Sequence, residues 1–351
     1  MQEGGSVIEA GPSAAVVATV ARADDLAADD AVHEAIEVLT RANRTERHGD
    51  LERALVRLRR EGAEHLPLGQ TRPPSAIAPI PADGTIVEVA SESLTADVLR
   101  DGIARSGCVL VRGLASAERA ARLAAGLDAA LAAYDAALAG SGSVDAGWYD
   151  PGPMPDRVSP GLPEDVHRAF LRSRGSLWTV DSPRMLFELF ELIDEVGLGP
   201  LMTDFLGERP VMSAIKGTLR RMPPDVDTDG RWHQDGAFLG EHVAAFNCWL
   251  ALTPCGVDAP GLDIVPKRLE GIVANDGARY DWAASDEAVA AAAADTPILR
   301  PEFGAGDALI FDHLLLHRTG ASPAMTQERH AIESWFFAPS AYPAGQVPVL
   351  Y

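Results

Sequence analysis

The chain of 351 residues is 47% hydrophobic and carries a formal net charge of −21 at pH 7. Its length allows one large domain or two ordinary ones, with enough apolar side chains for a buried core. The negative charge argues against nucleic acid and anionic membrane surfaces as partners, because both attract Lys and Arg through their phosphates. The sequence has no apolar run near the roughly 18 residues of a membrane-spanning helix and no basic start typical of a secretory signal. We therefore expect a cytoplasmic protein.

The three cysteines, Cys108, Cys248 and Cys255, include no Cys-x-x-Cys pair. This spacing argues against both a disulfide framework and a thiolate zinc site. Cys108 and Cys248 lie inside apolar runs, which is typical of small core side chains. Any metal in this protein is therefore expected to be held by nitrogen and oxygen ligands.

Residues 1–70 are rich in Ala, Arg, Asp and Glu and poor in aromatic side chains. Two short amphipathic helices are predicted in this extension, one beginning near Asp30 and one near Asp50, which has the side chain of a good N-cap. A Pro-rich stretch then opens a linker, assigned to residues 71–93. The extension is expected to cover the core or to join two copies of the chain in a homo-oligomer.

Residues 94–351 are predicted to form a single domain. It opens with a helix at 95–105, a short buried strand at 107–113 and a long Ala-rich helix at 115–139. The segment 140–163, dense in Gly, Ser, Pro and Asp, has no regular pattern. Such a segment is typical either of a lid over a substrate site or of a plain surface loop.

The second half of the chain changes from helical to strand-like periodicity. A helical segment is predicted at 181–206, ending at Gly207. Beyond it, segments of strand-like sequence alternate with Gly- and Pro-containing turns, at 211–222, 244–252, 262–266, 308–313 and 332–337. Many short strands after a block of helices predict an α+β fold, with a jelly-roll type of β-sandwich flanked by helices.

The strongest local motif for chemistry is the segment Trp232–Gly236. In an extended chain, residues i and i+2 project from the same face, so His233 and Asp235 can both reach one metal ion. Gln234 between them is turned aside. Alone, this His-x-Asp pattern is a weak signal, because short motifs also arise by chance and as hydrogen-bonded pairs.

A second histidine raises the value of this motif. His317 follows the apolar segment 306–316 and precedes a turn of small residues. Two His and one carboxylate are the ligand set of non-haem Fe(II) oxygenases. His313 lies nearby and is an alternative ligand, but the small-residue turn favours His317.

Arg329 follows at the start of the last predicted strand. Its planar guanidinium suits the far carboxylate of a 2-oxo acid, which it can bind through two hydrogen bonds. A zinc hydrolase could use the same three metal ligands, but it would leave Arg329 unexplained. A non-catalytic binding protein on the same fold is a further alternative, although such a protein would be expected to lose a ligand.

From about residue 94 to the C-terminal end, the sequence resembles the phytanoyl-CoA dioxygenase family of Fe(II)- and 2-oxoglutarate-dependent oxygenases. The resemblance rests on six features in order, namely Gly107–Gly113, Trp232–Gly236, Trp249–Pro254, Gly261–Pro266, Gly306 to His317, and Arg329. It implies a double-stranded β-helix core of the cupin type, with the metal at its open end. The chain departs from the family pattern at Val265–Arg268, where Pro-Gly-Ser-His is common, so the usual contacts of that loop are not expected.

The resemblance also implies residue roles. The Fe(II) ligands are matched by His233, Asp235 and His317, and the 2-oxoglutarate site by Arg329, Thr319, Trp249 and Gln234. The implied reaction consumes O₂ and 2-oxoglutarate, releases succinate and CO₂, and hydroxylates an unactivated C–H bond of a small molecule. Tailoring of a specialised metabolite is favoured over acyl-CoA or lipid hydroxylation, while desaturation, ring formation and epimerisation stay open.

Five residues are candidates for substrate contacts. Lys216 and Arg220 lie on a predicted strand and could hold an anionic substrate, although a solvated face is the simpler interpretation. Three aromatic residues could line the substrate site, although packing in the core is the commoner fate of such side chains. They are Trp148, Tyr149 and Trp178.

Overall fold

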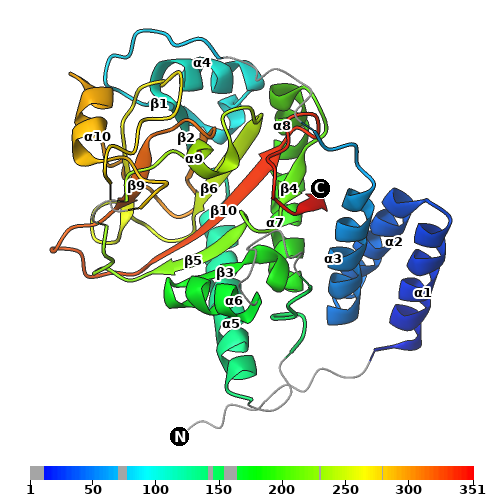
Figure 1. Cartoon of the computed structure of the whole chain (residues 1–351). Helices are drawn as coiled ribbons and strands as arrows, with labels where there is room; N and C mark the ends of the chain where they lie inside the picture. The colour runs from blue at the N-terminus through cyan, green and yellow to red at the C-terminus, as the bar shows by residue number, and fades with distance from the viewer. Residues whose placement is uncertain (1–11, 70–76, 141–144, 154–163, 229–230, 279) are drawn as a thin grey trace, which may run out of the picture.

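The computed structural model describes residues 12–69, 77–140, 145–153, 164–228, 231–278 and 280–351. A large β-sheet occupies the middle of the molecule, with helices packed against it and three N-terminal helices set to one side (Figure 1). Within these ranges no helix is both long enough and apolar enough to cross a membrane. Much of the segment 140–163, which was predicted as a lid or surface loop, falls outside the described residues.

The N-terminal helices are α1 (Ala14–Ala28), α2 (Val32–Thr45) and α3 (Gly49–Glu64). The sequence predicted only two helices here and missed α1, whose apolar residues are mostly alanines and give a weak helical pattern. The N-cap of α3 is His48 rather than Asp50. The His48 Nδ1 accepts a hydrogen bond from the Asp50 amide at 3.1 Å, which satisfies one of the free N–H groups of the first turn.

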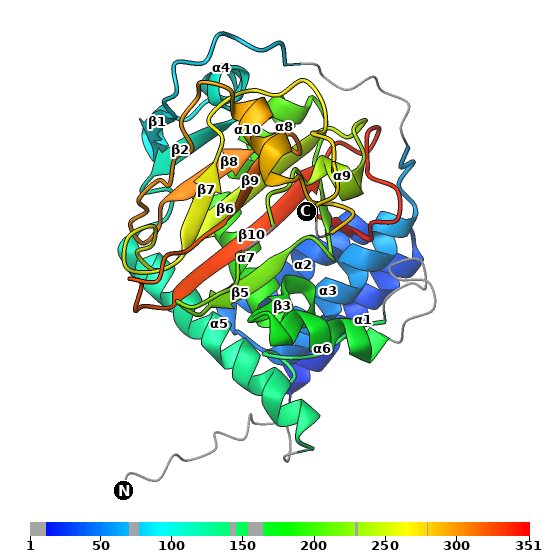
Figure 2. The same ribbon diagram turned by 60° about the vertical axis from the view of Figure 1, so that its left-hand side comes forward.

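The three helices pack together and dock on the rest of the chain through α3. Helix α3 contacts α7 (Pro183–Glu195) and strand β11 (Pro348–Leu350), and Arg59 donates a hydrogen bond to the Leu350 carbonyl at 2.9 Å. Glu52 of α3 is fully buried and pairs with Arg184 at 3.0 Å. These contacts make α1–α3 a cover over one side of the core (Figure 2).

The core begins with elements close to those predicted. They are α4 (Ala96–Ser106), β2 (Cys108–Arg112) and α5 (Ala117–Leu138). Residues assigned to the linker contain a further strand, β1 (Val87–Ala90), which pairs with β2 in parallel. Its alternating half-buried valines, Val87 and Val89, pack against the core, which is why this short segment joins the sheet.

The region predicted as one helix at 181–206 is two helices, α7 and α8 (Leu198–Leu206). Gly197 separates them with φ of 70°, a left-handed conformation that glycine adopts without strain. Before them lie α6 (Glu164–Ser173) and β3 (Ser176–Trp178), neither of which the sequence predicted. The long predicted strand 211–222 is also divided, because a turn at residues 214–216 separates two strands.

In the part of the chain that the structure describes, the large sheet has nine strands. Its remaining members are β4 (Val211–Ser213), β5 (Thr218–Met222), β6 (Ala245–Ala251), β8 (Ala308–Phe311) and β10 (Arg329–Phe337). The main path runs β1-β2-β8-β6-β10-β4-β11, and β5 joins β10 to β3. Strand β10 is the longest, and one of its edges pairs with β6 while the other pairs with β5 and then β4.

Successive residues of the central strands enter different apolar layers. In β8, Ala308 and Ile310 face the helices, whereas Leu309 and Phe311 face the interior of the sandwich. In β6, Trp249 faces the same interior. This alternation is the period of two expected for strands, and both faces are buried because helices cover the outer one.

A second, two-stranded sheet closes the interior. It consists of β7 (Gly261–Ile264) and β9 (His317–Gly320), and Leu262 and Ile264 share an apolar layer with the large sheet. Two short helices, α9 (Gly236–Leu239) and α10 (Asp286–Ala293), lie in the connections. The predicted α+β fold, with a double-stranded β-helix core flanked by helices, is confirmed.

Candidate active site

The three candidate metal ligands meet at one end of the small sheet. Backbone hydrogen bonds of 2.9 Å join the His233 amide to the His317 carbonyl and the His317 amide to the His233 carbonyl. Asp235 follows two residues later, at the start of α9. One ligand atom from each of His233, Asp235 and His317 can be chosen so that all three lie within 4.8 Å of one another. The apolar segment 306–316 is not one continuous strand, because β8 ends at Phe311, and the turn predicted after His317 was wrong, because His317 opens β9.

Both imidazoles are oriented by backbone carbonyl groups. The Nδ1 atom of His233 lies 2.9 Å from the Arg231 carbonyl oxygen, and Nδ1 of His317 lies 3.0 Å from that of Leu315. A carbonyl oxygen can only accept, so each Nδ1 carries the proton. The Nε2 lone pairs are therefore left for a metal ion, which is the usual arrangement of ligating histidines.

The electrostatics of this cluster also suit a metal cation. Burial, reinforced by His317, lowers the pKa of His233 to about 4, so its ring is neutral at pH 7. Burial alone would raise the pKa of Asp235, but the nearby Lys216 ammonium holds it well below its usual range. Asp235 is thus an anion that is only 2% exposed.

The two carboxylate oxygens of Asp235 have different surroundings. Oδ1 accepts a hydrogen bond from Lys216 Nζ at 2.8 Å. Oδ2 is buried, has no hydrogen-bond partner in the described part of the chain, and lies 3.7 Å from His317 Nε2. Ligand atoms about 2.1 Å from a common ion lie about 3 Å apart at adjacent coordination positions. A small movement of these side chains toward one another would therefore bring their ligand atoms to bonding distance of a metal ion. The residues fit a divalent ion.

A cavity of about 860 Å³ opens beside the cluster and is bordered by all three candidate ligands. Aromatic side chains line much of it. The Trp282 and Phe238 rings lie 5.4 Å and 6.2 Å from the His233 ring, and the Phe311 ring lies 5.1 Å from that of His317. This volume is within the usual range of small-molecule sites.

Arg329 borders the same cavity and is fully buried. Its Nη1 donates to the Gly261 carbonyl at 2.9 Å, while Nε is buried without a partner. Among the residues that the structure describes, Arg329 forms no ion pair within 4.0 Å, and Glu333 of the same strand pairs with Arg220 instead. Burial lowers the pKa of Arg329 to about 10, so it is charged at pH 7. A buried guanidinium that borders a cavity and has no ion-pair partner is suited to an anionic ligand.

A family model described as Phytanoyl-CoA dioxygenase (PhyH) matches residues 103–331. This span is more than half of the chain and contains the three candidate ligands and Arg329. The chain belongs to the phytanoyl-CoA dioxygenase family. It is an Fe(II)- and 2-oxoglutarate-dependent oxygenase, and the zinc-hydrolase and binding-protein alternatives are set aside.

Several solved structures are similar to this family member. AviO1 from Streptomyces viridochromogenes Tue57 shares 19% identity over 72% of this chain and 99% of its own, with a TM-score of 0.43. EctD from S. alaskensis with 2-oxoglutarate and 5-hydroxyectoine shares 17% identity over 77% and 84%, with a TM-score of 0.47. The epimerase SnoN with Fe³⁺, alpha ketoglutarate and nogalamycin RO shares 16% identity over 69% and 82%, with a TM-score of 0.42. No curated protein matches the sequence significantly.

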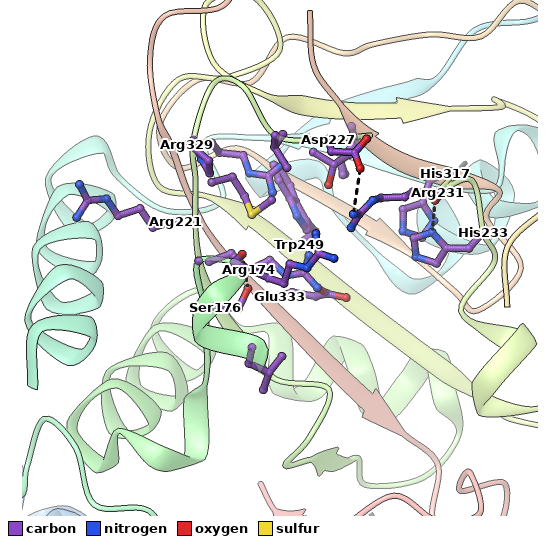
Figure 3. A pocket seen from close by; sticks show the side chains of 18 of the residues that line it. Arg174, Ser176, Arg221, Asp227, Arg231, His233, Trp249, His317, Arg329 and Glu333 are labelled. Carbon is purple, nitrogen blue, oxygen red and sulfur yellow. Dashed lines mark hydrogen bonds and ion pairs between the residues drawn. The ribbon is translucent and has the colours of Figure 1, made fainter. Parts of the chain in front are cut away.

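The structure of this oxygenase places two of the other predicted co-substrate residues in the cavity. Thr319 of β9 and Trp249 of β6 both line it, and the Arg329 guanidinium lies 5.2 Å from the centre of the Trp249 ring. In Figure 3, Trp249 is seen between the two histidines and Arg329. Gln234 is not among the lining residues, because its amide hydrogen-bonds the backbone at Gly271, Val273 and Leu314.

The predicted substrate residues divide into two groups. Lys216 and Arg220 line the cavity, although Lys216 lies in the turn before β5 and not on a strand. The three aromatic candidates lie elsewhere in the described chain. Trp178 is buried in the apolar layer under the helices, Trp148 packs against Arg184, and Tyr149 packs against Tyr134.

Sequence reasoning missed other residues of this site. Glu333 lines the cavity, pairs with Arg220 at 3.0 Å and accepts a hydrogen bond from Trp335 Nε1 at 2.9 Å. The period of two along β10 could have revealed it, because Arg329 and Glu333 are four residues apart and share a face. Trp282 and Phe238 lie in loops and a short helix, where no sequence pattern indicates their direction.

His313, the alternative metal ligand, points elsewhere. Its Nε2 lies 3.3 Å from the Glu241 carbonyl oxygen, and it borders a second, smaller cavity with Arg268 and Asp312. Arg268, which stands where the family pattern differs, forms a buried ion pair with Asp312 at 2.6 Å. This pair gives the unusual loop a structural contact of its own.

Proposed function

We propose that this oxygenase hydroxylates an unactivated C–H bond of a small molecule, with Fe(II) held by His233, Asp235 and His317. Arg329 is the proposed anchor for the far carboxylate of 2-oxoglutarate. The observation that supports the proposal most strongly is the buried Arg329 guanidinium, which borders the same cavity as the metal cluster and has no acidic partner in the described chain. Neither a zinc site nor a packed core needs such a group.

Bound Fe(II) would supply O₂ activation coupled to the decarboxylation of 2-oxoglutarate to succinate and CO₂. The chain would supply position and shielding. The carbonyl groups beside His233 and His317 fix the ring directions, and Trp249 and Phe311 keep the cavity wall apolar. We propose that the hydroxyl of Thr319, which lines the cavity two residues after His317, donates a hydrogen bond to the co-substrate.

The cavity lining favours an anionic substrate. Among the described residues, the cationic side chains that border it outnumber the acidic ones by seven to four. The cationic ones are Arg172, Arg174, Lys216, Arg220, Arg221, Arg231 and Arg329, and the acidic ones are Asp227, Asp235, Glu328 and Glu333. This local excess of positive charge stands out in a chain with a net charge of −21. Arg174 forms no ion pair within the described residues and lies over the Phe170 ring at 5.6 Å. It is available to a carboxylate or phosphate of the substrate.

Tailoring of a specialised metabolite remains the favoured role, because the aromatic side chains near His233 suit a rigid apolar body. Acyl-CoA hydroxylation is the alternative, and the arginines of the cavity would suit its phosphates.

Reaction in the cytoplasm and association of two copies through α1–α3 also remain proposals. Size-exclusion chromatography with light scattering, comparing the full chain with a variant lacking residues 1–69, tests the second.

The central proposal is tested by anaerobic titration of the protein with Fe(II) and 2-oxoglutarate. The wild type is expected to develop the weak visible charge-transfer band of the iron–2-oxoglutarate chelate, and Asp235→Ala and Arg329→Ala to lose most of it. Arg221→Ala is the matched control, because Arg221 pairs with Glu328 and Asp128. A wild type that binds metal without giving the band would contradict the assignment.

Substrate charge is then tested by succinate release from a panel of matched compounds. Each pair contains an acid and its neutral methyl ester, and acyl-CoA thioesters form a separate group. Acids are expected to stimulate succinate release at lower concentration than their esters, and Arg174→Met to reduce this preference. Equal stimulation by acid and ester throughout the panel would refute an anionic substrate.

A further inference from the structure

Lys216 occupies an unusual place for a lysine. It lies in the turn between β4 and β5, and its side chain is only 17% exposed. Its ammonium lies 4.2 Å from the centre of the Phe238 ring and 5.7 Å from that of Trp335. Aromatic faces attract a cation at such distances. The ammonium is therefore held inside the cavity wall instead of extending into solvent, as most lysine side chains do.

The partner of this ammonium is one oxygen of a candidate metal ligand. Lys216 Nζ donates to Asp235 Oδ1 at 2.8 Å. The other nearby carboxylate, Glu333, is already paired with Arg220 and Trp335. Asp235 Oδ2 has no such contact in the described structure and faces His317 Nε2 at 3.7 Å. The two oxygens of one carboxylate are thus separated into a hydrogen-bonded oxygen and a free one.

This separation matters for an octahedral metal. A carboxylate that binds through one oxygen occupies one position, whereas a carboxylate that binds through both occupies two. With two histidines, the first case leaves about three positions open and the second about two. 2-Oxoglutarate needs two of them, so O₂ has a position of its own only in the first case.

We propose that Lys216 is a positioning residue that restricts Asp235 to one-oxygen coordination and thereby keeps a metal position open for the reaction. The inference rests on the proposed function, because it assumes that Asp235 is a metal ligand. It assigns Lys216 to the metal side of the cavity and leaves substrate binding to the arginines. Lys216 does not contact the metal in this arrangement and acts through Asp235.

The test uses Mn²⁺ as the probe and compares wild type with Lys216→Met and Lys216→Arg. Lys267→Met is the matched control, since Lys267 is a lysine that does not line the cavity and whose Nζ donates to the Ala292 carbonyl at 3.2 Å. Three quantities are measured on the full chain: the Mn²⁺ dissociation constant, the water-proton relaxation of the Mn²⁺-loaded protein, and the 2-oxoglutarate dissociation constant by calorimetry. Melting temperatures with Mn²⁺ verify that each variant is folded.

Lys216→Met is expected to bind Mn²⁺ at least as tightly as wild type, because a competing positive charge is gone and both oxygens can chelate. Its relaxation enhancement should fall by roughly one third, as one of about three metal-bound waters is lost. Its affinity for 2-oxoglutarate should fall about tenfold, in the range of changes next to metal ligands. Lys216→Arg, which keeps a donor and a charge, should restore part of both losses, and Lys267→Met should keep the wild-type relaxation and 2-oxoglutarate affinity.

Two results would overturn the inference. One is a folded Lys216→Met protein with the relaxation and 2-oxoglutarate affinity of Lys267→Met, which would show that Lys216 does not control Asp235. The other is a folded Lys216→Met protein with weakened Mn²⁺ binding, which would make Lys216 a support of the site and not a restraint. If Mn²⁺ fails to bind even the wild type, the metal-site proposal itself fails, and that outcome is distinct from both.

Discussion

Replacing Arg329 by methionine should have opposite effects on stability and on co-substrate binding. The guanidinium is fully buried, and a pKa lowered to about 10 corresponds to about 3 kcal/mol by which burial disfavours its charged form. Methionine removes that penalty and fills a similar volume. It also removes the hydrogen bond to the Gly261 carbonyl, which contributes about 1 kcal/mol. The metal-free variant should therefore be more stable than wild type by about 2 kcal/mol.

Binding of 2-oxoglutarate should change in the other direction. A buried, charge-assisted pair lost at a binding site costs about 3–4 kcal/mol, which is a factor of roughly 10²–10³ in the dissociation constant. Urea unfolding of the metal-free proteins and calorimetric titration of the Mn²⁺-loaded proteins with 2-oxoglutarate measure the two effects. Arg221→Met is the control, because Arg221 is partly exposed and pairs with two acids.

The reasoning would be refuted by an Arg329→Met protein that is less stable than wild type and still binds 2-oxoglutarate within about twofold. Loss of stability would mean that the contacts of the guanidinium stabilise the fold by more than the burial of its charge destabilises it. Retained affinity would mean that the far carboxylate is bound by another cation of the cavity. A variant that is more stable but inactive would show a site that lowers the stability of the fold in order to bind its ligand.

Three further outcomes are expected. Asp235→Ala should weaken Fe(II) or Mn²⁺ binding by at least about a hundredfold, measured by competition with a coloured chelator, and unchanged affinity would exclude Asp235 as a ligand. Burial raises the pKa of the thiols of Cys108 and Cys248 to about 12 and that of Cys255 to about 11. None of the three should therefore react with iodoacetamide at pH 8 until urea unfolds the chain. Labelling of the native protein would contradict this expectation. Gly197→Ala should lower the free energy of unfolding by about 1 kcal/mol, because φ of 70° is unfavourable for a residue with a Cβ. No steric clash adds to this cost, since the new Cβ would meet no atom within 4 Å. An unchanged urea midpoint would show that the turn adapts.

The metal cluster could be predicted from the sequence because its chemistry has a local signature. His233 and Asp235 have the i, i+2 spacing of an extended segment, and His317 follows an apolar run in a chain that belongs to a known family. Arg329 was found because it opens the last predicted strand after His317, and its planar guanidinium suits the far carboxylate of a 2-oxo acid. These predictions needed residue types and order, and not the exact ends of the strands.

Contacts that depend on where elements meet could not be predicted in this way. The pairing of Lys216 with Asp235 arises because the turn at 214–216 divides a predicted strand and directs the ammonium toward α9. Trp148 and Trp178 were candidates only as aromatic residues; Trp178 is buried under the helices, and Trp148 is half-buried against the same apolar layer. Gly197 also escaped notice, since a single glycine between two apolar helices does not change the average pattern.

The reciprocal backbone hydrogen bonds between His233 and His317 have a consequence for how the site handles its ion. They set the separation of the two imidazoles by the same ladder geometry that spaces neighbouring strands, without any help from a metal. Removal of the ion by a chelator should therefore leave the two rings in place, and reloading should need no refolding step. The metal site is thus preformed and can bind a new ion after the old one is lost, which suits an enzyme whose ferrous ion is prone to oxidation and replacement over many cycles.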